Sequence, residues 1–95
     1  MAYYVYILYS RTLDRFYTGN TELDPEDRLR QHNEQFNPDS FSTKGIPWEL
    51  FLTMECSSRL QARRVESHIK KMKSRTYIQN LSSYPEMRSK LLNKY

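Results

Sequence analysis

The sequence predicts an α+β domain, with a three-stranded antiparallel sheet in the order β-β-α-β-α flanked by helices. Three observations lead to this fold class. Two runs rich in aromatic and β-branched residues flank a short polar segment, a strong helix start follows them, and a third such run precedes a helical capping box. Because a three-stranded sheet has to cover its apolar face, we expect the helices to pack on it.

The strands are expected over residues 3–9, 16–19 and 48–54, because these segments combine aromatic and β-branched side chains. Residues 10–15 are polar enough to form the loop of a hairpin between the first two strands.

The hairpin register decides what its tyrosines can do. A turn centred in the middle of the loop would place Tyr6 opposite Gly19, and Tyr17 diagonally beside Tyr6 on one face of the sheet. Glycine would leave open space beside the two phenols. A slip of one residue would separate the phenols, and packing on the sheet is the simpler explanation of strand tyrosines.

Two helices have clear start signals. Asp24 can cap a helix that has Pro25 in its first turn and runs to about Asn33. Residues 34–47 carry proline, glycine and serine and are expected to form a long loop.

Ser58 opens a capping box, and the helix that follows should run to about Met72. Its predicted buried stripe consists of Leu60, Val65, Ile69 and Met72. Residues 75–82 and the segment from Pro85 onward are expected to be helical.

The chain of 95 residues has room for one domain. We divide it into a main unit over residues 1–82 and a C-terminal helical extension over 83–95, packed on or trailing the same domain. No segment reaches the roughly 18 consecutive apolar residues of a membrane span, and the N-terminus lacks the pattern of a secretory signal. The expected location is therefore the cytoplasm, with no membrane partner.

Charge is strongly segregated along the chain. Residues 1–58 carry five basic and nine acidic side chains, whereas residues 59–95 carry ten basic and two acidic ones. A basic half of this kind is typical of a polyanion-binding surface, although a solvated helical surface explains it equally well. Cys56 is the only cysteine, which excludes an internal disulfide and cysteine-cluster zinc sites.

Several motifs together resemble the GIY-YIG nuclease family, especially its small stand-alone bacterial members. Val5-Tyr6-Ile7 is followed by Tyr17-Thr18-Gly19, and the likeness continues through segments 26–33, 41–50 and 62–70 to cover about residues 3–80. The sequence departs from the family pattern at Val5, where the name has glycine, and at Thr18, where it has isoleucine. Both changes affect packing beside the tyrosines more than chemistry.

The resemblance implies a metal-dependent endonuclease that hydrolyses phosphodiester bonds in DNA, in a process such as DNA repair or recombination. It implies catalytic roles for Tyr6, Tyr17, Arg28, His32 and Glu66, with Glu66 as the ligand of Mg²⁺ or Mn²⁺. Because no second acid is in a matching position, we expect a single-metal mechanism. The alternatives are an Arg28–Asp24 ion pair and a surface Glu66 paired with Arg63 or Lys70.

The roles of the two phenols stay open: Tyr6 is a candidate general base or water-positioning group, and Tyr17 a candidate hydrogen-bond donor. A nearby cation, Arg28 or the metal, is expected to lower the pKa of Tyr6. His32 is expected to hydrogen-bond a tyrosine or phosphate or to assist proton transfer. The expected nucleic-acid-binding residues are Gly19, Lys44, Arg63, Lys70 and Lys73.

With few residues outside the matched region, we expect low sequence specificity, or a protein partner that supplies targeting. RNA and branched or damaged DNA remain open as substrates, and the protein is expected to be a monomer or weak homodimer. Two other functions are compatible with the sequence: a nucleic-acid-binding module with weak or no cleavage, and a protein-interaction domain whose basic face meets an acidic partner.

Overall fold

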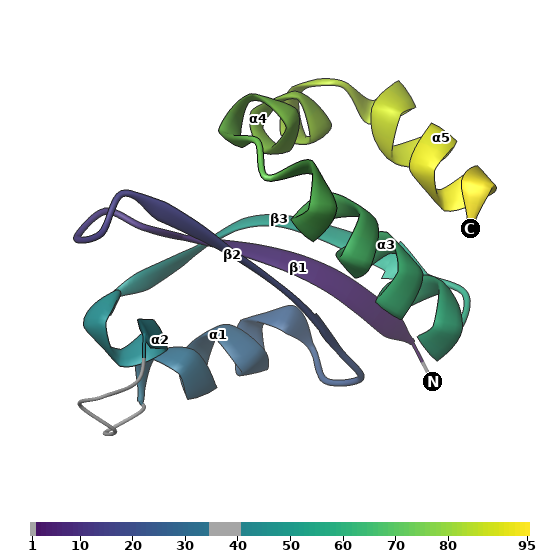
Figure 1. The fold of residues 1–95 in the computed structure, drawn as a ribbon. Helices are drawn as coiled ribbons and strands as arrows, with labels where there is room; N and C mark the ends of the chain where they lie inside the picture. Colours follow the sequence, from purple (N-terminus) through teal and green to yellow (C-terminus); the bar gives the residue numbers. More distant parts are fainter. Residues whose placement is uncertain (1, 35–40) are drawn as a thin grey trace.

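A three-stranded antiparallel sheet with helices on both faces forms the structure, a computed structural model that describes residues 2–34 and 41–95 (Figure 1). Helices α1 and α2 lie on one face, and α3, α4 and α5 lie on the other. The elements are β1 (Tyr3–Ser10), β2 (Arg15–Thr21), α1 (Pro25–Asn33), α2 (Phe41–Lys44), β3 (Trp48–Cys56), α3 (Arg59–Met72), α4 (Arg75–Ser83) and α5 (Pro85–Lys94).

The sheet has the order β2-β1-β3, so β1 is the central strand and β2 is an edge. Tyr6 pairs with Gly19, and Leu8 pairs with Tyr17. The register expected from a turn centred in the loop is therefore confirmed.

Alternation along β1 divides the core into two parts, because successive side chains of a strand point to opposite faces. Val5 and Ile7 pack under the α3–α5 layer, with Val65, Ile69 and Leu81 of that layer. Tyr6 and Leu8 point to the opposite face and form a smaller cluster with Trp48. The two parts of the core thus place Tyr6 on the α1 side of the sheet.

The main helices begin and end close to the positions that the sequence indicates. The Asp24 carboxylate accepts a hydrogen bond from the backbone of Glu26 and caps α1, and Ser58 caps α3 by accepting one from Gln61. At the other end of α3, Lys73 takes the left-handed conformation that usually favours glycine, with φ of 47°.

The predicted apolar stripe of α3 was only partly right. Val65 and Ile69 are buried, but Leu60 and Met72 are 55% and 45% exposed. Ala62 takes the place of the larger side chains against the sheet. Leu60 lies on the opposite side of the helix from Ile69, whereas Met72 is the last residue of α3. Isolated exposed apolar residues are normal on a protein surface.

Other differences concern the lengths of elements. Strands β2 and β3 each continue beyond the predicted segments, because pairing with β1 extends along the whole of the central strand. The expected loop over 34–47 contains the one-turn helix α2; residues 35–40 lie outside the described part of the chain. Within residues 2–34 and 41–95, no helix has the length and apolarity needed to cross a bilayer.

Helix α5 packs against the same core as the rest of the chain. Leu91 is buried with Leu81 of α4, and the Gln61 amide of α3 donates a hydrogen bond of 2.8 Å to the Leu92 carbonyl. The Tyr95 hydroxyl hydrogen-bonds His68 of α3 at 2.9 Å.

Candidate active site

Gly19 creates the space in which the Tyr6 phenol lies. A Cβ atom built on Gly19 would lie 2.5 Å from the Tyr6 hydroxyl oxygen and 2.6 Å from its Cζ. The end of the phenol therefore occupies the volume that any other side chain on β2 would fill. The Tyr17 ring lies beside it, with the two ring centroids 6.4 Å apart. Tyr6 is 1% exposed, whereas Tyr17 is partly exposed.

Helix α1 adds an imidazole to the two phenols. His32 is 2% exposed, and its Nε2 lies 3.0 Å from the Tyr6 hydroxyl. The His32 ring also packs edge-on against Tyr17, with centroids 4.9 Å apart. Within the described residues, His32 Nδ1 is buried without a hydrogen-bond partner. The prediction that His32 hydrogen-bonds a tyrosine is therefore confirmed.

Arg28 lies one turn before His32 and projects from the same side of α1. It is half-buried, and its guanidinium donates a hydrogen bond of 2.8 Å to Gln31. The alternative pairing with Asp24 does not form, because the Asp24 carboxylate caps the helix. Arg30, in contrast, is exposed and pairs with Asp27. Within the described residues, therefore, no ion pair neutralises the charge of Arg28.

Burial controls the protonation of the Tyr6–His32 pair. It raises the pKa of the Tyr6 phenol, and the lowering effect of Arg28 does not compensate for it. Arg28 thus lowers this pKa, as expected for a nearby cation, but the net shift is upward because the effect of burial is larger. Burial, reinforced by Arg28, lowers the pKa of His32. Both groups are consequently neutral at pH 7, and the phenol can donate its proton to Nε2.

Glu66 approaches from the other side of the sheet. It lies on α3, its side chain is 15% exposed, and one carboxylate oxygen accepts a hydrogen bond from the Asn20 amide at the edge strand β2. The other oxygen forms a 2.6 Å ion pair with Lys70. The negative charge of Glu66 is near enough to contribute to the raised pKa of Tyr6. The alternative pairing with Lys70 is thus observed, and it coexists with the contact to Asn20 on β2.

The donors around Glu66 can be compared with what a divalent cation requires. Within the described residues, no group of three or more acidic, histidine or cysteine side chains could hold a metal ion. Magnesium does not need such a group, since it keeps several waters and binds through one or two carboxylates plus substrate phosphates. Glu66 fits this pattern, provided that Lys70 leaves the carboxylate oxygen that it now occupies.

The predicted nucleic-acid-binding residues separate into different regions. Lys70 and Lys73 line a groove between α3 and β2, together with Tyr17. Arg63 borders another hollow, on the side of α3 that carries Arg64 and Lys71. Lys44 is exposed at the end of α2, on the face of the sheet that carries α1.

Asn20 contacts Glu66, and the sequence alone did not identify it as a residue of the site. It follows Gly19 on β2, so its side chain points to the opposite face, toward α3. The hairpin register contained this signal, because it pairs Asn20 with Val5, whose side chain also faces α3. The contact with Glu66 depends on tertiary packing that the sequence does not specify.

The model of the GIY-YIG catalytic domain matches residues 2–79 of this chain. The chain belongs to the GIY-YIG family. The matched range includes Tyr6 and Tyr17, Arg28 and His32 of α1, and Glu66. The match confirms the resemblance and the α+β fold inferred from the sequence. No curated protein and no solved structure matches the chain significantly.

Membership of the GIY-YIG family identifies the domain as one of the nuclease type, which acts on nucleic acid. Nucleases of this family generally use divalent metal ions. The geometry described above therefore belongs to a domain whose general reaction is phosphodiester hydrolysis.

Proposed function

We propose that this protein is a metal-dependent endonuclease that hydrolyses phosphodiester bonds in DNA with low intrinsic sequence specificity. The observation that carries the proposal is the clustering of Tyr6, Tyr17, Arg28 and His32 on one face of the sheet, with the charge of Glu66 acting on the same phenol. Hydrolysis requires an oriented water, a proton acceptor and fixed positive charge, and these side chains can supply each of them.

Arg28 is the group that binds the scissile phosphate. Its planar guanidinium suits two phosphate oxygens, and its charge is not cancelled by an acidic neighbour within the described residues. Tyr17 is partly exposed beside it, so its hydroxyl can hydrogen-bond the attacking water or the phosphate.

Tyr6 and His32 accept the proton of the attacking water together. The water proton moves to the Tyr6 oxygen, while the phenol proton moves to His32 Nε2 across the 3.0 Å hydrogen bond. Neutral His32 is the stronger base of the pair at pH 7, because burial keeps the Tyr6 phenol protonated. This mechanism assigns Tyr6 to proton relay and Tyr17 to positioning.

Glu66 is the residue that would hold a single Mg²⁺ or Mn²⁺ ion, and Asn20 would keep its carboxylate in place. When bound, such an ion supplies Lewis-acid stabilisation of the charge that develops on the phosphate. With the ion bound, Lys70 would separate from Glu66 and become available to a neighbouring phosphate.

Nicking of supercoiled plasmid in the presence of Mg²⁺ or Mn²⁺ tests the proposal. We expect wild-type protein to nick the plasmid and Glu66→Ala to lose that activity by at least about a hundredfold. The matched control is Glu86→Ala, which removes the other acid of the basic half, on α5, and should cut like wild type. Equal cutting by wild type and Glu66→Ala would contradict the proposal.

A DNA-binding module without cleavage is the second candidate, and one observation favours it. Both carboxylate oxygens of Glu66 are engaged by protein groups, Asn20 and Lys70. If this arrangement persists in the presence of metal and DNA, the protein would bind DNA without cutting it. Salt-sensitive binding without nicking by the wild type would identify this function.

A further inference from the structure

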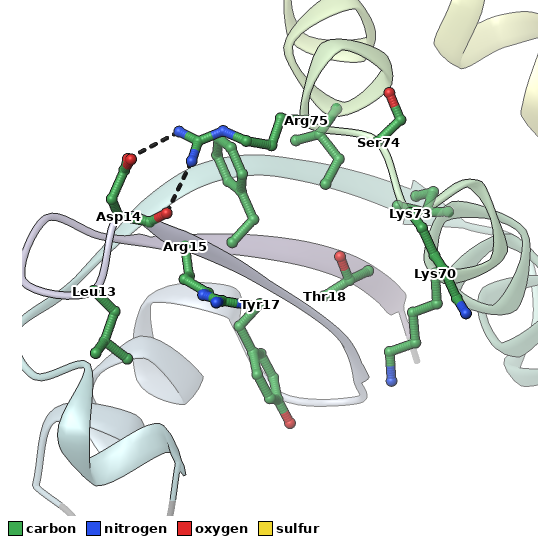
Figure 2. A pocket seen from close by; sticks show the side chains of 12 residues that line it. Leu13, Asp14, Arg15, Tyr17, Thr18, Lys70, Lys73, Ser74 and Arg75 are labelled. Carbon is green, nitrogen blue, oxygen red and sulfur yellow. Dashed lines mark hydrogen bonds and ion pairs between the residues drawn. The ribbon is translucent and has the colours of Figure 1, made fainter.

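A groove of about 660 Å³ runs between the edge strand β2 and the junction of α3 with α4. Arg15 lines it from β2, Lys70 lines it from α3, and Lys73 lines it from the position that follows α3 (Figure 2). Its lining also includes the apolar side chains of Phe16, Ile69 and Ile78. Four basic residues and one acidic residue line the groove, so it carries a net positive charge.

The basic residues of the groove differ in their availability. Arg75 is held at the edge by Asp14, with hydrogen bonds of 2.9 Å and 2.8 Å to its carbonyl and carboxylate oxygens (Figure 2). Lys70 is paired with Glu66. Arg15 and Lys73 form no ion pair within the described residues. These two cations are therefore available to an anionic ligand.

Lys73 also has a backbone conformation that its residue type does not favour. It ends α3 with φ of 47°, where glycine would avoid the steric cost of a Cβ atom. A lysine at this position supplies a charge to the groove at a cost in stability, which indicates a role other than folding.

The groove is continuous with the candidate active site. Tyr17 lines the groove and packs against Tyr6 and His32. Lys70 lines the groove and contacts Glu66. Arg15 lies four residue steps before Gly19 on β2, which is about 13 Å of extended strand.

The geometry points to this groove as the track for the DNA backbone on one side of the cleavage site. Arg15 and Lys73 bind backbone phosphates beside the scissile bond, and Arg75 shapes the edge without binding DNA. This inference rests on the proposed function and extends it from the reaction centre to the path of the substrate. Contacts of this kind hold the backbone without reading base sequence.

Anisotropy of a fluorescent duplex of about 20 base pairs, measured in EDTA over about 50–250 mM KCl, tests the inference without cleavage. We expect Arg15→Gln and Lys73→Gly each to weaken binding roughly five- to tenfold at about 0.1 M salt and to reduce the salt slope by about 0.9. Lys73→Gly should keep or raise the Tm, since glycine suits the left-handed position. Loss of affinity with an intact fold would then belong to the lost contact.

Lys90→Gln is the matched control, because it removes one exposed positive charge on α5, away from the groove. It should change affinity less than about twofold. The inference is overturned if the groove variants bind like wild type, or if the control loses as much affinity as they do. Wild-type protein that does not nick DNA, together with groove variants that lose binding, would contradict only the proposed function.

Discussion

At the scale of the residue, the site depends on a close fit between a glycine and a tyrosine. The Tyr6 phenol is buried in the central strand, and its hydroxyl reaches the place of the missing side chain of Gly19. The hydroxyl therefore points toward the edge strand β2, and its hydrogen bond to His32 keeps it in that position. The glycine is therefore required by steric fit, and it shows no unusual backbone angle.

We expect Gly19→Ala to destabilise the fold and to displace the Tyr6 phenol. The new Cβ would overlap a side chain that packing holds in place, which typically costs about 1–3 kcal/mol. Thermal denaturation measures this loss. The cost should be smaller when Tyr6→Ala is also present, because the hydroxyl oxygen and the Cζ atom that the new Cβ would overlap are then both removed. Equal costs in both backgrounds would show that the Tyr6 ring is not the obstacle.

Buried His32 makes stability dependent on pH. Its pKa in the folded protein lies below the unfolded value of about 6.5, so the unfolded chain binds more protons between these two values. The stabilising contribution is complete above about pH 6.5 and is lost as the pH falls through the folded pKa. We expect the Tm to fall between about pH 7.5 and about pH 5.5.

His32→Gln should reduce this dependence of Tm on pH. His68, whose pKa is lowered by burial and by nearby lysines, contributes in the same direction. The matched control is therefore His68→Gln, in which the contribution of His32 remains. A Tm that depends on pH equally in wild type and in His32→Gln would contradict the burial of a neutral imidazole.

At the scale of the element, local sequence signals were sufficient to predict the helices and the hairpin. Capping by Asp24 and Ser58 involves residues only two or three positions apart, so the sequence specifies it directly. The register of β1 with β2 followed from one assumed turn. In contrast, the extent to which each residue of α3 is buried depends on the elements that pack against it, and this is why Leu60 and Met72 were assigned wrongly.

Arg75, the first residue of α4, illustrates a second limit of prediction from local sequence. Arg75 belongs to the basic half of the chain, but it binds Asp14 in the hairpin turn, 61 positions earlier in the chain. The carboxyl group of Asp14 has its pKa lowered to about 2 by this contact and by Tyr9. Such a long-range pair has no signature in the sequence, because neither residue has a periodic or motif-based partner.

At the scale of the whole molecule, the site joins two layers that meet only after the chain has folded. Tyr6, Tyr17 and the α1 residues share one face of the sheet, while Glu66 reaches the edge strand from the other. The sequence indicated which residues belong together through family resemblance. It could not indicate the contact of Asn20 with Glu66 or the burial that raises the pKa of Tyr6, because both arise from packing between elements.

The most direct test of a single site across the sheet is a cycle of single-turnover cleavage rates for wild type, Tyr6→Phe, Glu66→Ala and the double variant. If the two residues act on one phosphate, their effects are not additive, and the double variant should be about as slow as the slower single variant. If the two rate losses multiply in the double variant, Tyr6 and Glu66 act independently, and the account of one hydrolytic site is wrong.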